Sequence, residues 1–398
     1  MTDGPLTGVT ILDLTRVLSG PYCTMLAGDM GARVIKIEHP NHGDDTRAWG
    51  PPFVGGESAY FLSVNRNKES LALDFKTPRG RSVLDRLIAR ADVLVENFRP
   101  GTLTDLGLGY EALSAKHPRL IYVSVSGFGQ TGPRRTEAGY DAMIQAEGGL
   151  MSVTGLPDGP PVRVGVAVAD LTAGMLAFHG MLLALLARDR TGRGQLVDVS
   201  LLDAVTSLLT YQGQRYFATG ESPPRTGNRH AAIAPYETFE TADGLLMLAV
   251  GNDEQWRRLC GVLGTSADDD RFRTNGQRVA NRAALRHTLE PPIRMKPASA
   301  WTTILRDADV PCGAVRSLDQ AFRDPQLIAR DMIASVDHPT IGVLPLVGLP
   351  IKLSETPGAI RCAPPRLGEH TRRILRDDAG LTDQEIADLE GARAIRCV

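Results

Sequence analysis

The first half of the chain alternates short aliphatic and β-branched runs with segments of helical periodicity. The runs that predict strands are 9–14, 33–38, 70–75, 92–96 and 120–126. Between them we expect a helix from Gly20 to Met30 and another from Pro78 to about Ala91, since proline suits a first helical turn. Strands that alternate with helices predict an α/β fold with a mostly parallel sheet. In such folds ligands bind beyond the carboxyl ends of the strands.

The pattern continues with an alternating run at 162–168, which predicts another strand that leads at Asp170 into a helix. The apolar run 173–187 is fifteen residues long and is interrupted by His179. A run of that length suits a buried helix better than a membrane span. Residues 196–200 lead into a further helix that ends near Phe217.

A change in composition then divides the chain. Residues 221–228 are rich in turn formers, and the segment beyond them has its own strand at 245–250 and several helices. A proline-containing tail crosses back before a last helix from about Thr382. We therefore predict a large domain over 1–220, a linker with a smaller α+β domain over 221–330, and a second linker with a returning segment over 331–398.

Composition and charge exclude several classes of protein. A net charge of −2 and 5% aromatic residues give no footprint for nucleic acid. The five cysteines show no CxxC pair and the histidines lack metal-ligand spacing, so we expect neither a disulfide framework nor a metal. The start of the sequence lacks the features of a signal peptide. We expect a cytoplasmic protein that does not interact with a membrane.

The sequence GFGQTG at 127–132 matches the GxGxxG dinucleotide fingerprint and follows a predicted strand. An NAD(P)-dependent oxidoreductase is therefore one alternative. However, Pro133 and two arginines follow where the fingerprint requires an apolar helix aimed at a pyrophosphate. The pattern favours a tight glycine turn beside some other ligand.

Asp170 admits two interpretations from its position alone. As the residue between a strand and a helix it predicts an N-cap, which stabilises a helix by about 1 kcal/mol. The helix N-terminus also favours an ionised carboxylate, which could attack a thioester carbonyl because a thiolate is a workable leaving group. Chemistry alone leaves both roles open.

Two further features are weak individually. Residues 227–230 could form a mobile loop that donates backbone N–H groups to an oxyanion, or a plain interdomain turn. Cations near predicted strand ends or loops could bind phosphate groups. They are Arg16, Arg33, Lys36, Lys76, Arg99 and Arg135.

Several spaced blocks together resemble the family III CoA-transferases, the CaiB/BaiF-type group that includes formyl-CoA, carnitine and dicarboxylate CoA-transferases. The blocks are LDLTRVLSGP (12–21), GDMGARVIKIE (28–38), NRNK (65–68), LDFK (73–76), ENFRPG (96–101), GFGQTGP (127–133), GYD (139–141), TGRGQ (191–195), PCGAV (311–315) and LGEHT (367–371). They cover nearly the whole chain.

The resemblance implies that Asp170, within VAVADLTAG (166–174), is the nucleophile. It would form an aspartyl mixed anhydride and then an aspartyl-CoA thioester. The resemblance further implies a Rossmann-like large domain joined to the smaller one by two linkers, in an interlocked homodimer. Residues expected to contact CoA or substrate are Arg16, Leu18, His39, Leu73, Lys76, Asn97, Phe98, Arg99, Tyr140, Asp141, Gly227, Asn228 and Arg229.

Three departures from the family narrow the function. Leu18 stands where the formyl-CoA enzyme has glutamine, and Gly227 is followed by Asn-Arg-His instead of a run of glycines. Tyr140 stands where the 2-methylacyl-CoA racemases, a sister branch and another alternative, use a histidine base. A tyrosine with a pKa near 10 is a poor base near neutrality, so this position favours transfer over racemisation.

We therefore expect an enzyme that transfers CoA from succinyl-CoA, or a similar dicarboxyl-CoA, to a small carboxylic acid. Arg16 or Arg229 could recognise the distal carboxylate of such an acid through a bidentate contact. Coenzyme A and acyl-CoA are then substrates, and no permanently bound cofactor is expected.

Overall fold

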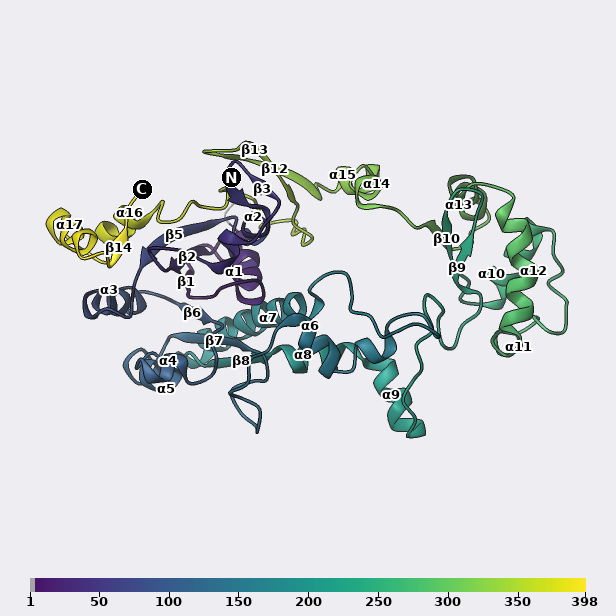
Figure 1. Ribbon diagram of the computed structural model, residues 1–398, viewed down its shortest axis with the longest axis horizontal. Helices are drawn as coiled ribbons and strands as arrows, with labels where there is room; N and C mark the ends of the chain where they lie inside the picture. The colour runs from purple at the N-terminus through teal and green to yellow at the C-terminus, as the bar shows by residue number, and fades with distance from the viewer. Residues whose placement is uncertain (1–3) are drawn as a thin grey trace. The chain divides into compact units, whose positions relative to one another are not determined.

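The computed structural model describes residues 4–398, which divide into two compact units (Figure 1). The larger unit contains the chain up to Leu150, then Arg163–Tyr211 and Pro325–Val398. The smaller unit contains Met151–Val162 and Gln212–Asp324. The segment Met151–Val162 lies in the smaller unit, although its place in the sequence assigned it to the predicted large domain.

A seven-stranded sheet forms the centre of the larger unit. Its strands are, in spatial order, β14 (Ile395–Arg396), β5 (Lys68–Leu73), β2 (Arg33–Glu38), β1 (Thr10–Asp13), β6 (Val93–Glu96), β7 (Ile121–Ser126) and β8 (Leu196–Ser200). All neighbouring pairs are parallel except β14 with β5. Without β14, the strands follow the order 3-2-1-4-5-6 along the chain, which is the order of Rossmann folds. The predicted α/β fold with a mostly parallel sheet is confirmed.

Helices cover both faces of this sheet because its strands are apolar on both sides. Ile11 and Val95 point into the core that contains α1, α7 and α8. Leu12 and Leu94 point into the opposite core, which contains α3, α16 and α17. The helices of the larger unit are α1 (Ser19–Asp29), α2 (Ala59–Val64), α3 (Pro78–Ile88), α4 (Thr102–Asp105), α5 (Tyr110–Lys116), α6 (Asp141–Glu147), α7 (Val168–Thr191), α8 (Leu201–Leu208), α15 (Pro325–Ala329), α16 (Thr371–Asp377) and α17 (Asp383–Gly391), with a 3-10 turn at Asp45–Ala48.

Helix α7 is the longest helix of the described residues, with 24 residues, and it carries Asp170 in its first turn. It ends at Gly192, whose φ of 70° gives the left-handed cap that glycine accepts without strain. Within residues 4–398 it is the one helix long and apolar enough to cross a membrane by length and composition. Core helices pass the same test, and Ala173, Ala177 and Met181 of α7 are fully buried against the sheet and α1.

The smaller unit has its own core and its own sheet. Three antiparallel strands are arranged in the order β11 (Cys312–Ala314), β10 (Leu245–Ala249) and β9 (Tyr236–Glu240). Its helices are α10 (Asp253–Leu263), α11 (Asn275–Ala280), α12 (Arg282–Arg294), α13 (Ala298–Asp307) and α14 (Leu318–Ala321), with a 3-10 turn at Met151–Val153. Helix α9 (Thr210–Thr219) begins at the boundary between the units. Trp256, Phe239 and Phe272 are fully buried in this core.

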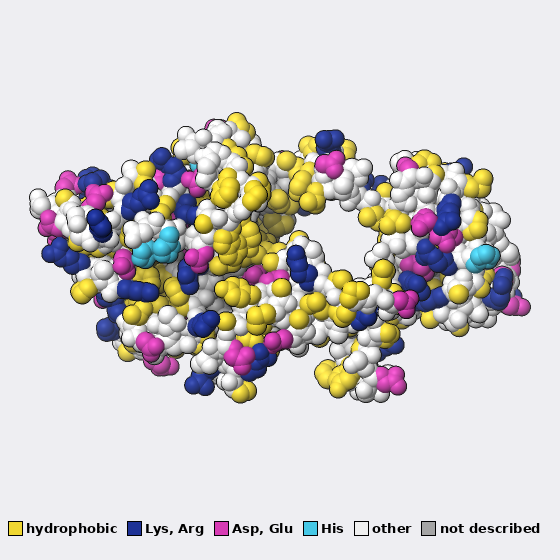
Figure 2. Space-filling model, viewed as in Figure 1, with side chains coloured by type: hydrophobic (Ala, Val, Ile, Leu, Met, Phe, Trp, Pro, Cys, Tyr) yellow, Lys and Arg dark blue, Asp and Glu magenta, His cyan; other side chains and the backbone are white. Residues whose placement is uncertain are grey.

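Two hairpins complete the larger unit: β3 (Phe53–Val54) with β4 (Glu57–Ser58), and β12 (Ile333–His338) with β13 (Gly342–Val347). Figure 2 shows acidic and basic side chains interspersed over the visible face, without a large area of one sign. This distribution fits the net charge of −2.

Two local predictions are wrong. Residues 162–168 alternate like a strand but pair with no strand among the described residues, and α7 already begins at Val168. Consequently the N-cap of α7 is Ala167, and Asp170 is a residue of the first turn.

Candidate active site

The site lies where the order of the sheet reverses direction. Strands β1 and β6 are neighbours, but the chain proceeds from them toward opposite edges of the sheet, which leaves a crevice at their carboxyl ends. Arg16 follows β1 and Asn97 follows β6. The Arg16 N–H donates to Asn97 Oδ1 (2.9 Å), and Asn97 Nδ2 donates to the Arg16 carbonyl (2.7 Å). These reciprocal bonds fix the two loops against each other.

Asp170 lines a groove at this crevice, which we call the Asp170 groove. Other side chains that line it are Arg16, Asn97, Phe98, Arg99, Ser126 and Tyr140. They come from the ends of β1, β6 and β7 and from the residue before α6. Tyr140 is 64% exposed, so a side chain that reaches into solvent stands at the edge of this groove.

The environment of Asp170 raises its pKa to about 7. Burial is the main cause, the negative charge of Asp141 adds to it, and a hydrogen bond from Ser19 opposes both. The expectation that the helix N-terminus keeps this carboxylate ionised therefore omits burial and the charge of Asp141. Near neutral pH the carboxyl group is poised between its two protonation states, as a functional group in a cleft often is.

Asp141 serves the helix that carries Asp170. Its carboxylate accepts hydrogen bonds from the Ala169 N–H (2.8 Å), the Asp170 N–H (3.4 Å) and Gln145 Nε2 (2.7 Å). Because Ala167 has no side-chain oxygen, Asp141 satisfies amide groups that an N-cap residue would otherwise satisfy. Its side chain thus anchors the first turn of α7.

Ser19 and Tyr60 are site residues that the sequence reasoning missed. Ser19 is the first residue of α1 and forms a hydrogen bond with Asp170. Burial raises the pKa of Tyr60 to about 12, and the negative charge of Asp170 contributes to this shift. Ser19 lies within the block 12–21, one of those that resemble the family, and this was the feature of the sequence that could have indicated it as a site residue. Leu18 lines neither cavity described here: it is buried with Met25 and Val64.

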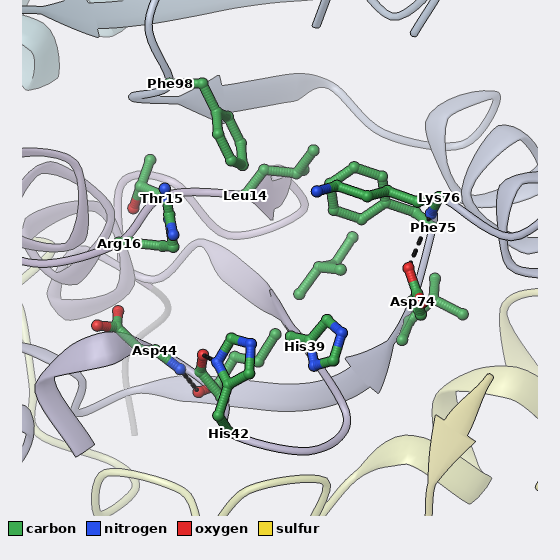
Figure 3. A pocket seen from close by; sticks show the side chains of 14 residues that line it. Leu14, Thr15, Arg16, His39, His42, Asp44, Asp74, Phe75, Lys76 and Phe98 are labelled. Atoms are coloured by element: carbon green, nitrogen blue, oxygen red, sulfur yellow. Dashed lines mark hydrogen bonds between the residues drawn. The ribbon is translucent and has the colours of Figure 1, made fainter. Parts of the chain in front are cut away.

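A second cavity, which we call the apolar cavity, lies beside the groove (Figure 3). Its apolar wall consists of Leu14, Ile37, Leu73, Phe75 and Phe98. The rings of His39 and His42 stack on its other side, with centroids 4.3 Å apart and planes 7° apart. Arg16 and Phe98 line both cavities, so the two spaces share a wall. Eight of the thirteen residues predicted to contact CoA or substrate line at least one of these two spaces.

The predicted phosphate-binding cations differ in how free they are. Within residues 4–398, the side chains of Lys76 and Arg99 have no ion pair, and they line the apolar cavity and the Asp170 groove respectively. Arg33 is held by Glu69 and Asp378, and Lys36 is fully buried against Asp44. Arg33 and Lys36 thus have structural partners.

Gly227, Asn228 and Arg229 belong to the smaller unit. Gly227 has a φ of 61°, and its N–H donates to the Gly155 carbonyl (2.9 Å). Arg229 lies 3.8 Å from Glu237, which also binds Arg286 at 2.8 Å.

The GxGxxG segment does not open a helix. After β7, residues 127–140 form bends and turns, and α6 begins only at Asp141. The Gln130 N–H donates to Asp198 (3.1 Å). The glycine motif therefore lacks the helix N-terminus that the dinucleotide fingerprint requires.

Comparisons with known proteins show the family of the chain. The model of CoA-transferase family III matches residues 6–371. The succinyl-CoA:glutarate CoA-transferase of Mus musculus is 44% identical over 375 residues, which are 94% of this chain and 86% of that protein. The succinate–glutarate CoA-transferase of Agrobacterium fabrum is 44% identical over 381 residues, 94% of this chain and 95% of that protein. A CAIB/BAIF family crystal structure from Brucella suis, 43% identical, has a TM-score of 0.85 and covers 94% of this chain and 98% of that chain. The chain therefore belongs to CoA-transferase family III and is a CoA-transferase.

Proposed function

We propose that this enzyme transfers CoA from succinyl-CoA to a second dicarboxylic acid of similar length, such as glutarate, with Asp170 as the nucleophile. The observation that carries the proposal is the position of Asp170, in a groove that shares Arg16 and Phe98 with an apolar cavity. The names of the mouse and Agrobacterium relatives support the choice of acids.

The two spaces suit the two ends of acyl-CoA. The apolar wall and the stacked His39–His42 pair fit a flat base, since aromatic rings stack on one another. Lys76 and Arg99 can meet phosphate oxygens because neither has an ion-pair partner among the described residues. The pantetheine arm would then pass Asn97 and Phe98 and bring the thioester to Asp170.

This placement supports the course of reaction that the family resemblance implies. The Asp170 carboxylate attacks the thioester carbonyl; a C–O bond forms, the C–S bond breaks, and CoA leaves as thiolate. The thiolate then attacks the Asp170 carbonyl carbon, releasing succinate and leaving an aspartyl-CoA thioester. The acceptor carboxylate attacks the carbonyl carbon of that thioester, which releases the CoA thiolate and forms a second mixed anhydride. The thiolate then attacks the acceptor carbonyl of this anhydride, which gives the new acyl-CoA and frees the Asp170 carboxylate. No proton needs to be transferred at any step, so an ionised Asp170 is sufficient.

A cation near the groove would favour dicarboxylic acids. Arg16 lines the groove and is 3.3 Å from Asp45, with both side chains nearly half exposed. A weak surface pair of this kind leaves the guanidinium available to a substrate carboxylate.

We further propose that the enzyme acts as a homodimer in the cytoplasm. Acyl-CoA then binds as a substrate and not as a permanently bound cofactor. The apolar face that α7 exposes through Leu183 and Leu186 supports a partner of the same kind.

The test is a panel of acyl-CoA donors against free acids, read by mass spectrometry. We expect succinyl-CoA with glutarate to be among the best pairs. Asp170→Asn should lower transfer by at least about 10³-fold, because it removes the nucleophile itself. Quenching with hydroxylamine should label Asp170 in the wild type and leave the variant unlabelled. Transfer by Asp170→Asn at the wild-type rate would refute the mechanism.

A further inference from the structure

The turn from β1 to α1 holds a β-branched residue in a left-handed conformation. Val17 has a φ of 70°, a region that costs L-residues energy and costs branched ones most. It lines the Asp170 groove between Arg16, which lines both cavities, and Leu18, the N-cap of α1. Such a conformation persists only where the surroundings enforce it.

A buried ion pair supplies that enforcement. Lys36 Nζ lies 2.9 Å from Asp44 Oδ2, and neither side chain has any exposed surface. Lys36 also donates to the Thr15 carbonyl (2.9 Å), and Asp44 Oδ1 accepts from the Val17 N–H (3.3 Å). The pair therefore holds the backbone immediately before and immediately after Arg16. Figure 3 shows Thr15 and Arg16 at the cavity together with Asp44.

The surroundings keep this pair charged. Burial opposes ionisation of Asp44, but Lys36 and the bonds from Thr46 together lower its pKa. Asp13, also buried, accepts from the Thr15 N–H (2.9 Å) and pairs with Lys68 (3.1 Å). Buried ion pairs add little net stability, since desolvation offsets their attraction. The hydrogen bonds of Lys36 and Asp44 to the backbone of Thr15 and Val17 give this pair another role, which is to hold the conformation of the turn.

We propose that Asp44, together with Lys36, is a positioning residue for CoA transfer. It holds Val17 left-handed, which directs Arg16 into the groove and sets Ser19 against Asp170. This inference rests on the proposed function, because it assigns the turn a task in acyl-CoA binding and in the ionisation of the nucleophile.

The experiment combines Asp44→Asn with two substitutions at Val17. Asparagine offers one acceptor oxygen where Asp44 uses two, so either the Lys36 contact or the Val17 contact is lost. Val17→Gly and Val17→Ala both remove the isopropyl group, but only glycine adopts a φ of 70° without strain. Alanine is thus the matched control for side-chain loss.

We expect Asp44→Asn to raise the KM for succinyl-CoA by about tenfold and the Kd for CoA similarly, by misdirecting Arg16. Adding Val17→Gly should recover most of both losses, and adding Val17→Ala should recover much less, because alanine keeps a Cβ that disfavours a φ of 70°. Equal behaviour of the glycine and alanine double variants would overturn the proposal, as would a folded Asp44→Asn protein with unchanged KM and Kd.

If Asp44→Asn does not fold, the pair of Val17 variants decides the matter in the wild-type background. Val17→Gly should then have a higher Tm and a lower CoA Kd than Val17→Ala, and the reverse order would overturn the proposal. Both the Kd for CoA and the Tm can be measured by calorimetry without any catalytic turnover. A wild type that binds CoA but transfers none would refute the proposed function and leave these measurements to judge the positioning role.

Discussion

Asp170 is a residue whose proton binding differs between the folded and unfolded chain. Its pKa is about 7 in the fold against an ordinary value of 3.8. Between these values the folded state keeps a proton that the unfolded state has lost, so the free energy of unfolding falls as pH rises. Asp170→Asn removes that dependence. We expect the variant to gain Tm over the wild type from pH 4 to pH 8; a Tm difference independent of pH would contradict the raised pKa.

The neighbours of Asp170 should move the pH profile in opposite directions. Because the nucleophile must be ionised, kcat/KM should rise with pH and reach half its maximum near pH 7. Asp141→Asn removes a negative charge while its amide oxygen can still accept from the Ala169 N–H, so the acid limb should shift to lower pH. Ser19→Ala removes the hydrogen bond that lowers the pKa, so the limb should shift upward. Shifts of the same sign would show that other groups control the profile.

The sequence was sufficient to nominate Asp170 but not to describe its state. A strand-to-helix position suggested an ionised cap, whereas burial and the charge of Asp141 raise the pKa of Asp170 despite the hydrogen bond from Ser19. Both effects depend on side chains that the fold brings together from separate segments. Ser19 and Tyr60 were missed for the same reason, since each lies more than a hundred residues from Asp170 in the chain.

At the scale of elements, the packing of α1 against α7 sets the distance between Ser19 and Asp170. Gly174 makes this contact possible, because a Cβ there would lie 2.5 Å from the Ser19 carbonyl oxygen. A backbone atom cannot rotate away, so Gly174→Ala must separate the helices, at a cost of about 1–3 kcal/mol. The displacement of Ser19 should also lower kcat by roughly 10- to 100-fold.

Gly261→Ala is the matched control for this prediction. Gly261 lies inside α10 with no atom within 4 Å of an added Cβ, so alanine should stabilise by about 0.5–1 kcal/mol. Thermal unfolding and steady-state kinetics of both variants provide the measurement. A Gly174→Ala enzyme with unchanged Tm and kcat would show that the two helices do not set the site.

Strands were predictable where both faces are buried, because β1, β2, β5, β6 and β7 each contain a short run of aliphatic residues and alternate with helices along the chain. The run 162–168 also alternates, yet its amides bind elsewhere: the Val164 N–H donates to Gln145 Oε1 (2.9 Å). Strand β14 escaped notice because two residues carry no periodicity. Whether a segment pairs as a strand depends on residues far away in the chain, so a short stretch of sequence cannot predict it as it predicts a local pattern.

At the scale of the whole molecule, α7 has apolar residues on two faces. One face is buried against the sheet, and the other presents Leu183 and Leu186, which are 66% and 63% exposed. Leu176 and His179 precede them at helical spacing on the same side. A monomer gains nothing from an apolar stripe in water, whereas a second copy of the chain would bury it.

Leu183→Glu with Leu186→Glu should therefore weaken self-association, because an interface would have to desolvate two carboxylates without partners. We expect the wild type to sediment as a dimer and the double variant to shift toward monomer at micromolar concentration, measured by analytical ultracentrifugation. Met295→Glu is the control: Met295 is 81% exposed in the smaller unit, so it tests the effect of an added charge away from α7. A double variant that dimerises as strongly as Met295→Glu would place the interface elsewhere. A monomeric wild type would leave the stripe on α7 without a partner and contradict the homodimer.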